Sequence, residues 1–210
     1  MKEDEIYTTI LMTDGEPLSK KNSMRSIMYT WTLQNGGKTS LFTLGMGSDS
    51  NLATLDAASA LNRGRLYSSP TKRGIKRKLL KLMKNIHAPI AKNLSARAIS
   101  TGSATSIALF PKGNNMPHLY LNQPIVILGS CDTLDDFILF VQGRCKNCWF
   151  NIKKNVSFIH AKKGGNPLRK EWALQQAYRC YERYTQDDNP EHLVEARELL
   201  APFDIQPAFE

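Results

Sequence analysis

Apolar and β-branched residues gather in three short runs within the first 88 residues, and an amphipathic stretch follows each run. The first run, residues 6–13, shows little alternation, which favours a strand buried on both faces. Strands that alternate with helices predict right-handed crossovers and a parallel sheet. The predicted strands span 6–13, 39–44 and 65–68, and the predicted helices span 19–33, 49–61 (capped by Asp49 or Ser50) and 71–86.

The pattern changes after His87-Ala88-Pro89, where alternating positions and frequent turn residues predict a β-rich region. Short strands at this spacing are typical of a sandwich or a barrel. The candidate strands are 91–100, 106–110, 124–130, 137–142 and 149–160.

Two helices are predicted at the C-terminal end of the chain. Asn166-Pro167 and Asn189-Pro190 each place a capping residue before a proline, which suits a helix start. The apolar stripe of the first helix comprises Leu168, Trp172, Leu174, Ala177, Tyr178, Tyr181 and Tyr184. The sequence therefore predicts an α/β fold: a partial doubly wound, Rossmann-like parallel sheet (1–88), a β-sandwich-like domain (89–161) and a helical hairpin (162–210).

Charge is distributed unevenly along the 210 residues, whose net charge is +9. Residues 182–210 contain eight acidic and two basic residues, so the rest of the chain carries +15. This asymmetry indicates either an anionic partner or an acidic tail that docks on its own basic body. The sequence has no secretory signal and no run of apolar residues long enough to span a membrane, so the cytoplasm is the default expectation.

Three motifs in order resemble the C-terminal half of a von Willebrand factor A (vWA) domain. The strand 9–17 (TILMTDGEP) resembles the late-sheet strand that ends in Thr-Asp-Gly, 41–55 resembles the next strand with its Gly-x-Gly turn, and 62–67 resembles the last strand. Residues 119–129 resemble the β-region downstream of vWA in inter-alpha-trypsin-inhibitor heavy-chain-like proteins. The resemblance implies a protein-protein interaction module.

The resemblance also implies a metal-ion-dependent adhesion site, with Asp14 as one ligand and Glu16 as a weaker candidate. The position of Asp14 fits, because open parallel sheets bind ligands at the carboxyl ends of their strands. The family's Asp-x-Ser-x-Ser loop does not occur before Asp14. The site is therefore incomplete, and we expect Mg²⁺ to bind only if the missing half is supplied.

A half sheet leaves strand 6–13 at an edge, although its uncharged apolar character suits a central position. Three explanations stay open: another chain supplies the missing half, two copies pair edge to edge, or the chain is a fragment. We expect another protein as the partner.

Seven basic residues lie within 72–84, which suggests a second function: binding of nucleic acid or of an anionic surface. The alternative is the solvated face of a surface helix, and nucleic acid is less favoured because no aromatic residues interleave. The residues are Lys72, Arg73, Lys76, Arg77, Lys78, Lys81 and Lys84.

The remaining chemistry-bearing residues do not indicate an enzyme. Cys145 and Cys148 flank a predicted hairpin turn and are free thiols, half a zinc site or a redox pair. The four histidines are far apart, and no nucleophile-base arrangement follows from their spacing.

Overall fold

A three-stranded parallel sheet forms the N-terminal part of the computed structural model, which describes residues 5–15, 23–47, 50–102, 106–112, 115–146 and 148–209. Its strands lie in the order β1-β2-β3, with Thr9 opposite Leu41 and Thr43 opposite Leu66. The predicted parallel sheet is confirmed. The strands are β1 (Tyr7–Thr13), β2 (Thr39–Met46) and β3 (Leu66–Ser69).

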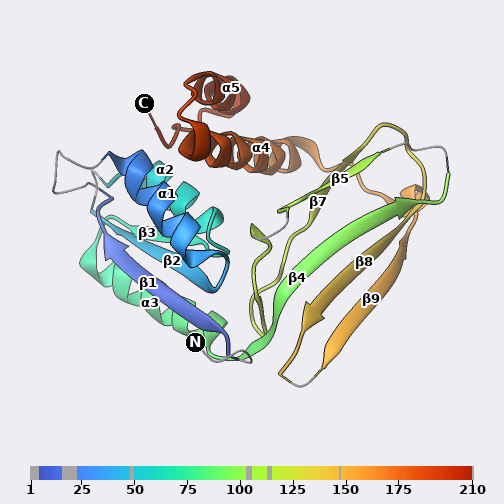
Figure 1. Cartoon of the computed structure of the whole chain (residues 1–210), viewed down its shortest axis with the longest axis horizontal. Coiled ribbons are helices and arrows are strands. Elements are labelled where there is room, and N and C mark those ends of the chain that lie inside the picture. The colour runs from blue at the N-terminus through green and yellow to red at the C-terminus, as the bar shows by residue number, and fades with distance from the viewer. Residues whose placement is uncertain are drawn as a thin grey trace.

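Helices cover both faces of this sheet, as a doubly wound fold requires. Helices α1 (Met24–Asn35) and α2 (Leu52–Ala60) lie on one face, and α3 (Lys72–Ile86) lies on the other (Figure 1). The crossovers β1-α1-β2 and β2-α2-β3 run in the same direction, so their helices share a face. On the opposite face, Phe42 and Leu44 pack against Ile75 and Leu82 of α3.

Polar side chains fix where these helices begin. The Ser23 side chain accepts a hydrogen bond from the Ser26 N–H, so α1 begins at Met24. The predicted start near residue 19 falls within residues 16–22, which lie outside the described part of the chain. Thr71 caps α3 in the same way, as predicted. The prediction of Asp49 or Ser50 as the cap of α2 is wrong: Asn51 accepts from the Thr54 N–H.

The first strand is less buried than its sequence predicted. Leu11 is 42% exposed and Met12 is 45% exposed, so β1 is not buried on both faces. The reason is topological, because β2 is the one strand that pairs with β1 among the described residues. The apolar pattern that suits a central strand lies at an edge.

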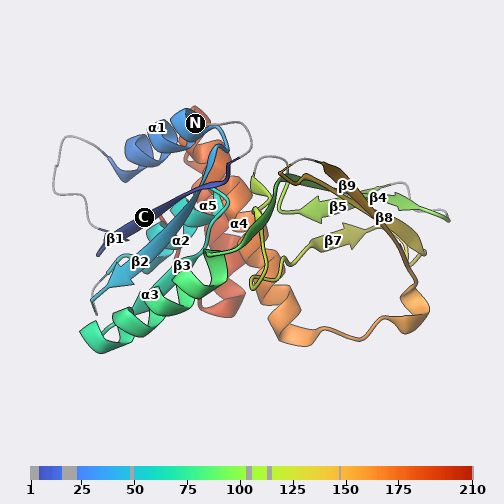
Figure 2. The ribbon, with the colours of Figure 1, turned by 90° about the horizontal axis from the view of Figure 1, so that it is seen from below.

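Residues 89–156 form two antiparallel sheets, which agrees with the predicted sandwich-like region. The larger has the order β6-β4-β8-β9, and the smaller pairs β5 with β7 and lies between α4 and the larger sheet (Figures 1 and 2). The strands are β4 (Pro89–Ser100), β5 (Ile107–Phe110), β6 (Leu119–Tyr120), β7 (Leu128–Cys131), β8 (Phe137–Arg144) and β9 (Trp149–Val156).

Two predicted strands of this region are too long. The strand expected over 149–160 ends at Val156, and a 3₁₀ turn (Phe158–His160) follows, where Asp136 accepts hydrogen bonds from Ser157 and Phe158. The strand expected over 124–130 pairs with β5 only from Leu128 onward, and residues 124–127 belong to no strand.

The C-terminal helices α4 (Gly165–Asp187) and α5 (Glu191–Leu200) pack against each other and against the N-terminal sheet unit. Ala177, Cys180 and Tyr181 of α4 share one buried cluster with Met28 of α1 and Ala57 of α2. The chain closes with a 3₁₀ turn (Ala201–Phe203), and Phe209 packs on Tyr181 and Tyr184.

The acidic tail packs on the chain's own body, but not on its most basic helix. The acidic tail docks on the face of the sheet that carries α1 and α2, whereas the basic helix α3 covers the opposite face (Figure 1). The tail therefore leaves the basic residues of α3 uncovered. Within the described part of the chain, no helix is both long and apolar enough to cross a membrane.

Candidate functional site

Asp14 lies at the carboxyl end of β1, in a turn held against the start of α2. Its carbonyl oxygen accepts a hydrogen bond from the Asn51 N–H at 2.8 Å, and its carboxylate accepts one from the Thr13 hydroxyl at 3.3 Å. Gly15 follows with φ +88°, and a Cβ there would lie 2.9 Å from the Asn51 carbonyl oxygen. The Asp14 side chain is exposed at the rim of the sheet.

A Mg²⁺ centre at this rim would need more oxygen ligands than the Asp14 carboxylate alone supplies. Such an ion needs several oxygen ligands around one point. No group of three or more His, Cys, Asp or Glu residues in the described ranges is placed to hold a metal ion. Glu16, the second predicted ligand, lies outside those ranges. Asp14 is therefore a lone carboxylate candidate in this part of the chain.

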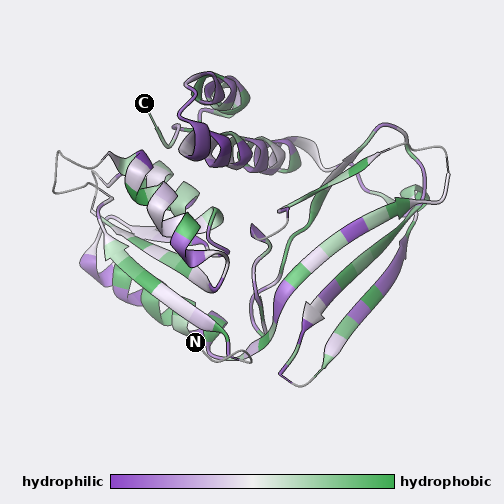
Figure 3. Ribbon diagram, viewed as in Figure 1, coloured by the Kyte–Doolittle hydropathy of each residue, from purple (hydrophilic) through white to green (hydrophobic). Residues whose placement is uncertain are grey.

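The β1 strand and helix α1 both carry exposed apolar side chains. Leu11 lies opposite Thr43, whose hydroxyl donates to the Leu55 carbonyl oxygen of α2, so Leu11 is on the face that α1 and α2 cover. On α1, Ile27 is 42% exposed and Trp31 is 41% exposed, although they recur at the helical spacing of a buried stripe. Figure 3 shows hydrophobic residues along much of β1.

The outer face of α3 carries all seven basic residues predicted there. Each of them is exposed, and none forms an ion pair within the described ranges of the chain. The helix contains no acidic residue, and Leu80 and Met83 are 53% and 49% exposed among the basic side chains. The structure therefore brings these seven residues together on one solvent-facing surface, which we call the α3 basic face.

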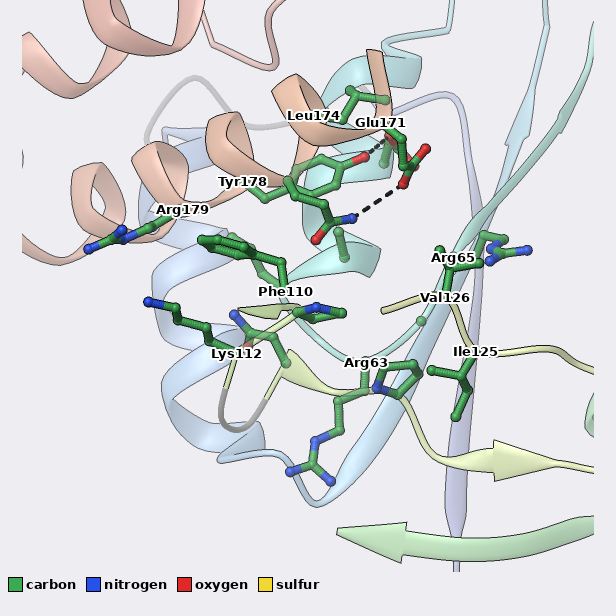
Figure 4. A pocket seen from close by; sticks show the side chains of 18 of the residues that line it. Arg63, Arg65, Phe110, Lys112, Ile125, Val126, Glu171, Leu174, Tyr178 and Arg179 are labelled. Carbon is green, nitrogen blue, oxygen red and sulfur yellow. Dashed lines mark hydrogen bonds between the residues drawn. The ribbon is translucent and has the colours of Figure 1, made fainter. Parts of the chain in front are cut away.

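A cavity of about 520 Å³ lies where the sheet unit, the β-region and α4 meet. Its labelled basic side chains lie around the rim and do not converge on one point (Figure 4). Inside it, the Tyr178 hydroxyl donates to Asp56 at 2.5 Å. Burial raises the pKa of Asp56, and burial together with the Asp56 charge raises the pKa of Tyr178.

A buried polar cluster joins the sheet unit to the β-region beside this cavity. The Arg63 guanidinium donates to Asn93 of β4 at 3.3 Å and lies 3.4 Å from Nδ1 of His118. His118 is 2% exposed, and burial, followed by the charges of Arg63 and Lys92, lowers its pKa to about 4. Burial also lowers the pKa of Arg63.

Sequence reasoning missed this cluster and the cavity, because their residues come from segments far apart in the chain. One local signal is the turn-like sequence Asn62-Arg63-Gly64, in which Arg63 has φ +62°. Nothing in the spacing of Arg63, Asn93 and His118 indicates that they meet.

The sequence matches no protein-family model and no curated protein. Among solved structures, the fold is similar to the ArnB paralog VWA2 from Sulfolobus acidocaldarius (19% identity, 92% of this chain and 54% of that chain, TM-score 0.42). It is also similar to an uncharacterized membrane spanning protein from Vibrio fischeri (13% identity, 38% of this chain and 47% of that chain, TM-score 0.33). The chain spans about half the length of each, and neither likeness is close enough to assign a family or a function.

Proposed function

We propose that this chain is a protein-interaction module of the vWA type that binds another polypeptide along β1 and acts without catalysis. The observation that carries the proposal is the edge position of β1, which pairs with β2 alone among the described strands and carries exposed Leu11 and Met12. An uncharged edge strand accepts an added strand through main-chain hydrogen bonds. The finer resemblance to inter-alpha-trypsin-inhibitor heavy chains stays a prediction.

In the purified protein, β1 of a second copy is a strand that can pair with the β1 edge. Two copies related by a two-fold axis would pair their β1 strands antiparallel. We expect the wild-type chain to self-associate, and Leu11→Lys to weaken the association constant about tenfold or more, because charge on an edge strand opposes pairing. Sedimentation equilibrium over a concentration series measures this.

Val194→Lys is the matched control, since Val194 is 51% exposed and lies on α5, away from β1 (Figure 1). It should leave the association constant unchanged. A wild-type chain that stays monomeric throughout the series, or an association that Val194→Lys weakens and Leu11→Lys does not, would contradict docking through β1.

Metal binding by this chain alone is expected to be weak. Asp14 offers one carboxylate, so Mg²⁺ or Mn²⁺ should half-saturate only in the millimolar range or above. Calorimetric titration of the wild type and of Asp14→Ala tests this. Sub-millimolar affinity that Asp14→Ala abolishes would show that the adhesion site is complete within this chain.

A second candidate function is the binding of an anionic surface by the α3 basic face, which the acidic tail leaves uncovered. We expect vesicles containing phosphatidylserine to bind the chain at low salt, and Arg77→Gln to weaken binding about fivefold, since each basic residue contributes about 1 kcal/mol. Lys162→Gln, an exposed lysine before α4, is the control.

Salt separates the two candidate functions. Attachment through the α3 basic face should fall steeply between low and physiological salt, because exposed charges are screened. Pairing along the apolar β1 edge should change little over the same range. Vesicle binding that is insensitive both to salt and to Arg77→Gln would exclude the second candidate.

A further inference from the structure

The tip of the β8–β9 hairpin holds two cysteines face to face. The last pair of the ladder is Arg144 opposite Trp149, so Cys145 and Cys148 occupy the next facing positions. The Cys145 N–H donates to the Cys148 carbonyl oxygen at 2.8 Å. Both side chains are free thiols, and their mutual hydrogen bond, followed by burial, raises the pKa of Cys145.

This register suits a disulfide without rearrangement of the backbone. Facing residues that share a ladder hydrogen bond have Cα atoms about 5.5 Å apart. Disulfides span Cα separations of about 4.4–6.8 Å. Cys145 and Cys148 also meet across a very short loop, so closing the ring restricts little additional chain freedom.

The pair is accessible from solution, unlike Cys180, which is 1% exposed. Cys148 and Lys146 are exposed, and Trp149 is 68% exposed directly after Cys148. Cys148 is the more exposed of the two thiols, so its sulfur is the better placed nucleophile toward a reagent from solution.

We propose that Cys145 and Cys148 form a reversible thiol–disulfide exchange site whose co-substrate is a low-molecular-weight disulfide such as glutathione disulfide. The Cys148 thiolate attacks one sulfur of that disulfide, forms a mixed disulfide and releases one glutathione thiolate. The Cys145 thiolate then attacks the Cys148 sulfur, closes the Cys145–Cys148 bond and releases the second glutathione thiolate. The two protons lost by the protein thiols are taken up by the two leaving thiolates, and the protein is oxidised by two electrons.

A zinc site is the competing use of two thiols on a hairpin. Structural zinc takes four ligands. Within the described ranges, no group of three or more His, Cys, Asp or Glu side chains could hold a metal ion. The described residues therefore supply at most half of a zinc site here, which is why exchange chemistry is the better-supported use of the pair.

The test is equilibration of the folded full-length chain in glutathione redox buffers, followed by acid quenching, alkylation and peptide mapping. We expect one product, a Cys145–Cys148 disulfide about 2 Da lighter than the dithiol form, that reverts in excess reduced glutathione. Oxidation should change the fluorescence of the neighbouring Trp149, and Trp149→Phe should remove that signal without affecting the mass change.

Single variants assign the order of attack. Cys145→Ser should trap a stable glutathione adduct on Cys148, because no second thiol can displace it. Cys148→Ser should acquire an adduct on Cys145 about tenfold more slowly, because Cys145 is less exposed to the reagent. Cys131→Ser, which leaves the pair intact, should behave like the wild type.

Several outcomes would overturn the proposal. One is a wild-type pair that stays reduced in glutathione disulfide while both cysteines react with the alkylating reagent. Others are separate adducts on the two cysteines with no internal bond, disulfide-linked dimers, or stoichiometric Zn²⁺ uptake that blocks oxidation.

Discussion

Gly64→Ala is expected to lower the free energy of unfolding by about 3 kcal/mol or more, because the added methyl group would overlap backbone and not a movable side chain. A Cβ at Gly64 would lie 1.7 Å from the Leu41 carbonyl oxygen and 2.4 Å from its carbon. Strand β2 cannot move away from Gly64, because both sides of the contact are held by hydrogen bonds. The Leu41 N–H donates to the Asn62 carbonyl oxygen, and the Gly64 N–H donates to the Ser59 carbonyl oxygen. Urea unfolding followed by circular dichroism measures the loss.

Gly36→Ala is the comparison variant and should lower the free energy of unfolding less than Gly64→Ala does. Gly36 ends α1 with φ +50°, and its Cβ would meet nothing closer than 3.8 Å. Only the left-handed backbone conformation is unfavourable there, at about 1 kcal/mol. Equal losses for Gly36→Ala and Gly64→Ala would show that the turn before β3 does not approach β2 as closely as described.

Acidification is expected to remove about 3 kcal/mol of folding stability through His118 alone, since its pKa falls from 6.5 to about 4 on folding. The folded-state pKa lies below the unfolded one, so the unfolded chain binds the proton first. The contribution of His118 is fully present above pH 6.5, declines as pH falls, and is exhausted near pH 4. Unfolding in urea at a series of pH values measures the slope.

His118→Asn should flatten this part of the profile, because asparagine can accept the Arg63 hydrogen bond and does not titrate. The absolute stability of the variant will be lower, since a buried ring is lost, so the comparison is between slopes. His160→Asn, which removes an exposed histidine, is the control. An unchanged slope in His118→Asn would show that His118 is not buried beside Arg63.

The parallel sheet was predictable because its signals are local. Thr71 precedes an amphipathic run and caps α3, and Gly36 takes the left-handed conformation that ends α1. Each strand run lies between such signals, so the order of elements could be read along the chain. Asp14 lies at the end of β1 for the same local reason, as the sequence predicted.

The burial of individual faces was not predictable, because it depends on which neighbours are present. Ile27 and Trp31 have the spacing of a core stripe, yet α1 buries Met28 against α2 and α4 and leaves both of them half exposed. Leu11 has the character of a central strand residue and lies at an edge. The spacing of hydrophobic residues identifies a helix or a strand, but it does not show whether another element packs over that face.

The docking of the tail and the polar cluster beneath it depend on tertiary contacts alone. Tyr178 meets Asp56 across 122 positions of sequence, and Arg63 meets His118 across 55. Taken singly, each of these residues is of a type that is common at protein surfaces. Their pairing emerges only when α4 and the β-region close against α2.

The most direct test of the open β1 edge is amide hydrogen exchange of residues 7–13, compared between dilute and concentrated wild-type chain. β1 pairs with β2 alone among the described strands, so the amides that face away from β2 should exchange rapidly when dilute and become protected as the chain associates. Leu11→Lys should abolish this gain in protection. Exchange along β1 that is unchanged by association, with new protection on α3 or α5 instead, would contradict association through the β1 edge.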